Sequence, residues 1–157
     1  MDHRPSFRLY FTALLTLVIF ASCDRSIYRE FHKFDNYTWG RFDKVTFDIP
    51  IEKETAGDIV VAIRHLDQFP YNEISMNIIL TTPEGEERIL ERTVFLKDAN
   101  GKFRGSVAGN QWDIEEILWK NFSFHQEGTY RIEIENIHSR MGMVGLIDIG
   151  MIVRKSK

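Results

Sequence analysis

The sequence predicts an all-β domain: a two-layer antiparallel β-sandwich, of jelly-roll or immunoglobulin-like type, with one short helix. The prediction rests on segments in which apolar and polar residues alternate, on turn residues between those segments, and on a length that suits one domain. The chain has 157 residues, of which 43% are hydrophobic and 27% charged, as in ordinary globular proteins. No repeat, low-complexity tract or linker divides it.

Alternation is typical of a strand that buries one of its two faces. The clearest example is 130–135, where Tyr130, Ile132 and Ile134 alternate with charged residues. Six further segments are predicted to be strands, namely 27–34 at an edge, 45–51, 59–64, 74–80, 88–96 and 143–153. The last of these is apolar on both faces at most positions, which predicts a central strand.

Turn chemistry separates several of these strands. Thr82-Pro83-Glu84-Gly85 suits a type I turn, with proline at its second position and glycine at its fourth. Asp98-Ala99-Asn100-Gly101 contains an Asn-Gly pair between two extended runs, which indicates a hairpin.

One short amphipathic helix is expected at 113–122. Asp113 can cap it, and Glu116 three residues later completes a capping box. Trp112 and Ile117 occupy the positions of a hydrophobic staple, and the apolar residues at 114, 117 and 118 fall on one helical face.

The first 22 residues have the pattern of a signal peptide. Two arginines lie within residues 2–8, and an apolar run at 9–20 is broken only by two threonines. A helix of that length spans about 18 Å at 1.5 Å per residue, whereas a bilayer core is about 30 Å thick. The run therefore favours a cleaved export signal over a transmembrane helix.

Phe20-Ala21-Ser22-Cys23 resembles a bacterial lipobox, in which the cysteine receives a diacylglycerol and becomes the new N-terminus. We therefore expect a lipoprotein signal peptide at 1–22 and a lipid-anchored domain at 23–157, of which 23–36 is partly a tether. An ordinary secretory signal with an incidental cysteine is the alternative. Two or more acyl chains hold a protein stably on a membrane, since each buried methylene contributes about 0.8 kcal/mol. No acidic run follows Cys23, which favours the periplasmic side of the outer membrane.

The search for chemistry finds no catalytic, nucleotide-binding or metal-binding motif. The histidines are scattered, and His65 with Asp67 falls short of a metal site. We therefore predict no enzymatic activity, no cofactor and no metal. A net charge of −3 argues against a nucleic-acid partner, because such proteins present basic faces.

Aromatic residues are the remaining candidates for contacts with a partner or ligand. Tyr71 lies in the loop 69–72 between two strong strands, and Trp39 and Trp112 are further candidates. The alternative is that these rings close the ends of the sandwich.

Several short motifs follow one another along the chain. They are the lipobox at Cys23, Tyr37-Thr38-Trp39, Ile63-Arg64, Phe69-Pro70-Tyr71-Asn72, Pro83-Glu84-Gly85, the stretch from Gly105 to Asp113, Gly128-Thr129-Tyr130, Arg140-Met141 and the run from Val144 to Gly150. Their order and spacing resemble the GldH-type gliding-motility lipoproteins of Bacteroidetes. Phe69 stands where that family often has tyrosine, and the glycine-rich stretch before Trp112 is rearranged.

The resemblance implies a link to gliding machinery and its associated type IX secretion apparatus, and it brings no catalytic residues. We therefore expect a non-enzymatic accessory protein, bound to the membrane through lipid on Cys23 and to other envelope, gliding or secretion proteins through its surface. The alternative is a sandwich module on the outer membrane that binds a glycan or small ligand.

Overall fold

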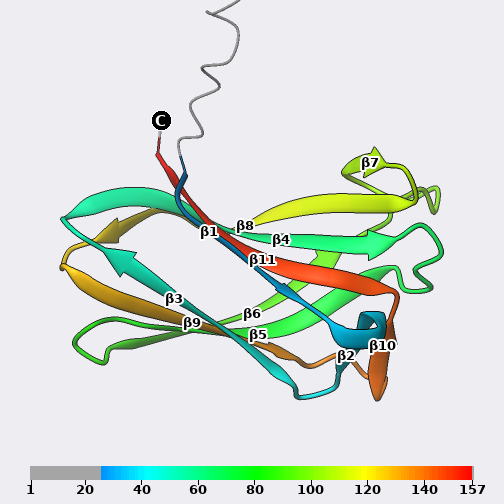
Figure 1. Cartoon of the computed structure of the whole chain (residues 1–157), viewed down its shortest axis with the longest axis horizontal. Coiled ribbons are helices and arrows are strands. Elements are labelled where there is room, and N and C mark those ends of the chain that lie inside the picture. Colours follow the sequence, from blue (N-terminus) through cyan, green and yellow to red (C-terminus); the bar gives the residue numbers. More distant parts are fainter. Residues whose placement is uncertain (1–25, 157) are drawn as a thin grey trace, which may run out of the picture.

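The computed structural model describes residues 26–156, whose strands stack in two layers (Figure 1). One 3-10 helix, η2 at Asp35–Tyr37, lies among them. The strands are β1 (Ser26–Lys33), β2 (Thr38–Gly40), β3 (Lys44–Ile51), β4 (Thr55–Leu66), β5 (Glu73–Thr81), β6 (Glu87–Phe95), β7 (Ser106–Ala108), β8 (Gln111–Phe124), β9 (Gly128–Asn136), β10 (Gly142–Val144) and β11 (Leu146–Lys155). Within residues 26–156, no helix is long and apolar enough to cross a membrane.

The two layers are a five-stranded sheet, in the order β1-β11-β4-β8-β7, and a four-stranded sheet, in the order β3-β9-β5-β6. A ribbon of β2 and β10 lies at one end of the sandwich. The antiparallel pairs nest around the β5–β6 hairpin, since β4 pairs with β8, β3 with β9 and β1 with β11. A long hairpin wrapped into two sheets in this way is a jelly roll. The structure confirms the predicted sandwich and shows that it is of the jelly-roll type, not the immunoglobulin-like type.

The core lies between the two sheets, where the alternating apolar residues of both meet. β3 shows the rule most simply, because its residues alternate between exposed and buried from Lys44 to Ile51. Ile78 of β5 and Ile132 of β9 are 0% exposed. Full burial of such a side chain contributes about 1.5–3 kcal/mol, so this alternation is what holds the layers together.

The predicted helix at 113–122 is wrong, because these residues belong to β8. Ile114, Leu118 and Phe122 are buried at a spacing of four residues. That spacing suits a helix, but as a multiple of two it also places the residues on one face of a strand. β4 pairs with β8 along almost its whole length. This pairing outweighs a cap that contributes only about 1 kcal/mol.

The run 143–153, predicted as one central strand, is divided at Gly145 into β10 and β11. Gly145 has a φ of +95°, and its N–H donates to the carbonyl of Tyr37 at 2.8 Å. β11 is central as predicted, between β1 and β4, whereas β10 turns away to pair with β2. β1 forms the edge of the five-stranded sheet, as expected for 27–34.

Candidate docking surfaces

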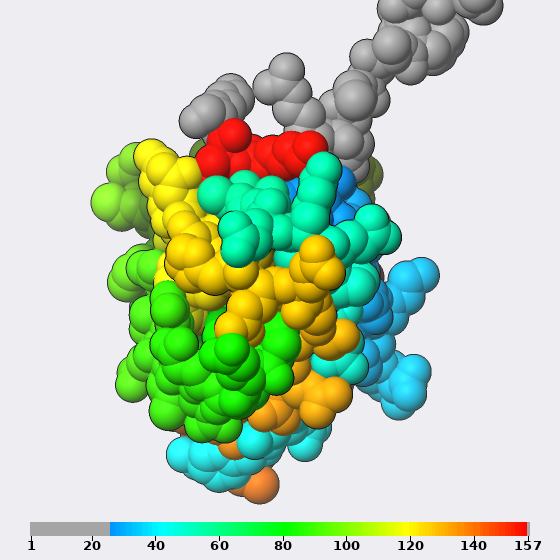
Figure 2. Space-filling view, turned by 90° about the vertical axis from the view of Figure 1, so that its left-hand side faces the viewer, coloured from blue at the N-terminus to red at the C-terminus, as the bar shows by residue number. Residues whose placement is uncertain are grey.

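The two ends of the sandwich carry different groups of residues. The proximal end contains the start of β1 at Ser26, the end of β11 at Lys155 and the β3–β4 turn at 52–54 (Figure 2). The distal end contains η2, the β2–β10 ribbon and the loops at 67–72 and 96–105. β1 runs from one end to the other, and its eight residues at about 3.3 Å each span roughly 26 Å. Cys23 and the signal peptide lie outside the described residues.

An array of neighbouring rings closes the distal end of the core. Centroids of successive rings in this aromatic array lie 4.6–5.6 Å apart. Its members, in spatial order, are Trp112, Phe103, His65, Phe69, Tyr71 and His138. Edge and tilted contacts of this kind each contribute about 0.5–1.5 kcal/mol beyond the area they bury. The array therefore packs the distal loops, which supply three of its rings, onto the end of the core.

The aromatic candidates Tyr71 and Trp112 both belong to this array. The Tyr71 hydroxyl donates to the carbonyl of Gly142 at 3.0 Å and so ties the loop at 69–72 to β10. Trp112 Nε1 donates to Asp67 Oδ1 at 2.9 Å. Both side chains are partly exposed, and their polar atoms are engaged within the domain.

Trp39 is a core residue. Its side chain is 1% exposed, it stacks on Phe34 at 5.4 Å, and its Nε1 donates to the carbonyl of Asp43 at 3.1 Å. Trp39 therefore offers no surface to a ligand in this conformation. It anchors β2, which the alternation of the sequence did not reveal as a strand.

His65 points into the core, away from solvent. Its side chain is 0% exposed, Nδ1 lies 2.9 Å from the carbonyl oxygen of Leu66, and Nε2 has no hydrogen-bond partner among the described residues. Burial lowers the pKa of His65 below its ordinary value, which keeps the imidazole neutral. Asp67, the residue considered together with His65 as a possible metal ligand, accepts a hydrogen bond from Trp112 Nε1 instead. Residues 26–156 contain no cluster of three or more groups able to hold a metal ion.

Four exposed apolar side chains lie on or next to the β2–β10 ribbon. This distal patch consists of Tyr37, Phe42, Met141 and Val144, whose side chains are 51%, 59%, 85% and 57% exposed. Backbone hydrogen bonds join the segments that carry these side chains: Arg41 N–H donates to the carbonyl of Met141 at 2.9 Å, and β2 pairs with β10 across the ribbon. The Arg41 guanidinium lies 4.5 Å from the Phe42 ring centroid.

The backbone of the distal patch is strained. Tyr37 and Phe42 have φ values of 53° and 68°, in the left-handed region that bulky residues rarely adopt. Asn136, which is 0% exposed, holds the ribbon in place through bonds of 3.0 and 3.1 Å from Nδ2 to the carbonyls of Trp39 and Gly40. Strain of about 1–3 kcal/mol per residue persists only where the surrounding structure enforces it, and it clusters at functional sites.

A charged network lies on the outer face of the five-stranded sheet. Arg64 Nε donates to Asp113 Oδ1 at 2.7 Å, and Arg64 Nη1 donates to Asp148 Oδ2 at 3.0 Å. Asp148 is 1% exposed, and its second oxygen has no partner among the described residues. Burial raises the pKa of Asp148 despite the neighbouring guanidinium, while the hydrogen bond to Asp113 raises that of Arg64.

The chain is similar in sequence to proteins of one known family. The profile of the family described as "GldH lipoprotein" matches residues 26–153. The protein named "Gliding motility lipoprotein GldH" from Flavobacterium johnsoniae is 25% identical over 147 residues, which cover 87% of this chain and 90% of that protein. Neither name describes a catalytic activity. A chain in the "Structure of infectious bursal disease virus Gx strain" aligns with 83% of this chain and 33% of its own length, at 16% identity and a TM-score of 0.34, too low to carry any argument.

Proposed function

Because the chain belongs to the GldH lipoprotein family of gliding motility, we propose that it is a non-enzymatic accessory component of a gliding and type IX secretion machine. The family places the chain among lipid-anchored proteins of the cell envelope. In this proposal the lipid is on Cys23, the domain hangs from the outer membrane into the periplasm, and its work is to bind another envelope protein.

The distal patch is the observation that carries the proposal. Four exposed apolar side chains lie at the end of the domain opposite the start of β1. Two of them have left-handed φ values, and the buried side chain of Asn136 holds the nearby carbonyls of Trp39 and Gly40. Exposed apolar patches of this kind mark sites of protein interaction. The exposed arginines Arg41 and Arg140 flank the patch, so a partner surface with apolar and acidic residues would complement it.

The anchor gives this surface a defined position. Cys23 precedes Ser26 by three residues, which span at most about 10 Å when extended. The proximal end would therefore lie against the membrane, with the distal patch directed away from it. Confinement to one membrane face raises the effective concentration of the patch near other envelope components without any additional contact.

The experiment that tests the proposal places a photo-crosslinking amino acid at position 141 of the lipidated protein in its own host. Position 89, on the outer face of β6, is the matched control, because Ile89 is also an exposed apolar residue at 68%. We expect a defined crosslink to one envelope protein from position 141 and none from position 89. Equal crosslinking from both positions, or none from 141, would contradict the proposal.

Function is tested with the double variant Met141→Glu/Val144→Glu against Ile89→Glu. We expect the double variant to lose colony spreading or type IX secretion at an unchanged membrane level, because carboxylates in an apolar interface lose their hydration. Ile89→Glu should behave as the wild type. Normal spreading and secretion in the double variant would exclude the distal patch as the docking surface.

A further inference from the structure

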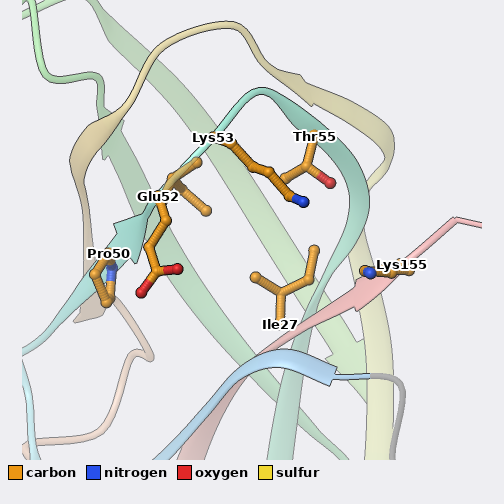
Figure 3. A pocket seen from close by; sticks show the side chains of 7 residues that line it. Ile27, Pro50, Glu52, Lys53, Thr55 and Lys155 are labelled. Atoms are coloured by element: carbon orange, nitrogen blue, oxygen red, sulfur yellow. The ribbon is translucent and has the colours of Figure 1, made fainter.

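A groove of about 300 Å³ opens at the proximal end, between the start of β1, the β3–β4 turn and the end of β11 (Figure 3). Figure 3 shows Lys53 extending from the turn toward Ile27, Glu52 lying beside Pro50, and Lys155 on the other side of Ile27. Six residues that line the groove are Ile27, Pro50, Glu52, Lys53, Thr55 and Lys155.

The chemistry of the groove is zwitterionic. Lys53, Lys155 and Glu52 are exposed, and none of them forms an ion pair within residues 26–156. Ile27 and Pro50 contribute apolar surface beneath these charges. Two ammonium groups and one carboxylate over an apolar base complement a ligand with one phosphate, one ammonium and an attached hydrocarbon.

The location of the groove identifies what can reach it. Ser26, at the start of β1, lies beside the groove-lining Ile27 and only three residues after Cys23. Since three residues extend at most about 10 Å, acyl chains on Cys23 would bring the membrane surface to the mouth of the groove. A lipid headgroup is then present at high effective concentration, so weak contacts suffice to bind it.

We propose that the proximal groove binds the phosphoethanolamine headgroup of a membrane phospholipid, with Lys53 and Lys155 on the phosphate and Glu52 on the ammonium. This inference rests on the proposed lipid anchor at Cys23. The bound headgroup adds a second point of attachment to the acyl anchor, and so holds the domain with its distal patch facing away from the membrane. The groove is thus a second membrane contact that acts together with the acyl chains.

The test uses the mature lipidated protein in vesicles of phosphatidylethanolamine and phosphatidylglycerol. A single cysteine is introduced at Glu54, beside the groove, or at Met141, in the distal patch, and is labelled with a fluorophore. Lipids carrying a nitroxide on the headgroup act as quenchers. Cys23 is the one cysteine of the chain, so a lipidated protein has only the introduced thiol available for labelling.

We expect quenching at position 54 to be at least threefold stronger than at position 141. Lys53→Glu/Lys155→Glu should reduce it at least threefold, and so should replacement of phosphatidylethanolamine by phosphatidylcholine, whose methylated ammonium cannot donate to Glu52. The control Lys44→Glu/Lys102→Glu changes the net charge equally at two exposed lysines outside the groove and should have no effect. Equal thermal unfolding midpoints show that both double variants are folded.

The outcomes separate the inference from the proposed function. If one thiol per chain is labelled, the anchor at Cys23 stands. Equal quenching at positions 54 and 141 would then overturn the headgroup site, and so would quenching that the charge reversal leaves unchanged. Quenching that is unchanged in phosphatidylcholine overturns the assignment to phosphoethanolamine. Two labelled thiols per chain overturn the anchor at Cys23 and the inference with it.

Discussion

The outer faces of the two sheets differ in how much apolar surface they hide. On the four-stranded sheet, Ile89 is 68% exposed, and the ion pair between Arg131 and Asp48 lies in solvent. On the five-stranded sheet, Val60 and Ile152 are 1% and 0% exposed, although no third layer formed by residues 26–156 covers them.

Side chains on the edge strand and the charged network explain this difference. Phe31 of β1 lies over Gly150, where a Cβ would collide with its ring, and packs against the small outer cluster of Val60, Ala62 and Ile152. The Arg64 guanidinium lies 5.7 Å from the Phe31 ring centroid. The comparison shows that an outer sheet face can bury apolar side chains as fully as the core does when a ring and paired charges lie over it.

The largest expected effect tests that conclusion with one residue type on both faces. Ile152→Ala should lower the free energy of unfolding by about 2–4 kcal/mol, because it leaves a cavity under Phe31. Ile89→Ala should change it by less than about 0.5 kcal/mol, because its side chain is already in water. Urea denaturation of both variants measures the difference, and equal losses would show that the two faces are equivalent.

The next effect concerns the ion pairs of the two faces. Arg64→Gln should cost about 1–3 kcal/mol, a range that allows for partial solvent screening of Arg64, because Asp148 is left buried and without its charged partner. Arg131→Gln should lower stability far less than Arg64→Gln does, since exposed pairs contribute little. A cost for Arg131→Gln as large as that for Arg64→Gln would remove the distinction.

A smaller effect concerns the irregular backbone of the five-stranded sheet. Asn121 of β8 has a φ of 53°, close to a register shift against β4, and its N–H donates to Asp58 Oδ1 at 2.8 Å. Asn121→Ala should cost about 1 kcal/mol, because alanine is unfavourable in the left-handed region, whereas Asn121→Gly should be tolerated. Thermal denaturation compares the two, and an alanine variant as stable as the glycine variant would contradict this reason.

The smallest expected difference between the two faces is in how the free energy of unfolding changes with pH. Burial raises the pKa of Asp148, so the folded state keeps that proton to higher pH than the unfolded state does. Stability from this residue should therefore fall as pH rises from near 4 toward the raised pKa, and Asp148→Asn should abolish the fall.

Asp48 should show the opposite sign. Its hydrogen bond from Arg131 lowers its pKa, so its contribution is present above the ordinary value and is lost as pH falls through the lowered pKa. Denaturation of Asp148→Asn and Asp48→Asn from pH 3 to 7 measures both slopes, and two slopes of the same sign would refute this assignment.

The sequence by itself determined the architecture wherever the spacing of apolar residues fitted a strand and not a helix. Strands such as β3 and β9 bury every second residue, and no other structure buries that set, so the sandwich could be predicted. The family resemblance was readable because it rests on the order and spacing of short motifs, which are visible along the chain without the tertiary structure.

The tertiary structure alone decided the features that depend on long-range pairing. Ile114, Leu118 and Phe122 satisfy both a helix and a strand, and only β4 selects the strand. The distal patch and the proximal groove each join segments more than one hundred residues apart in sequence, such as Tyr37 with Val144 and Ile27 with Lys155. No local pattern encodes such proximity, because it arises only when the nested hairpin closes.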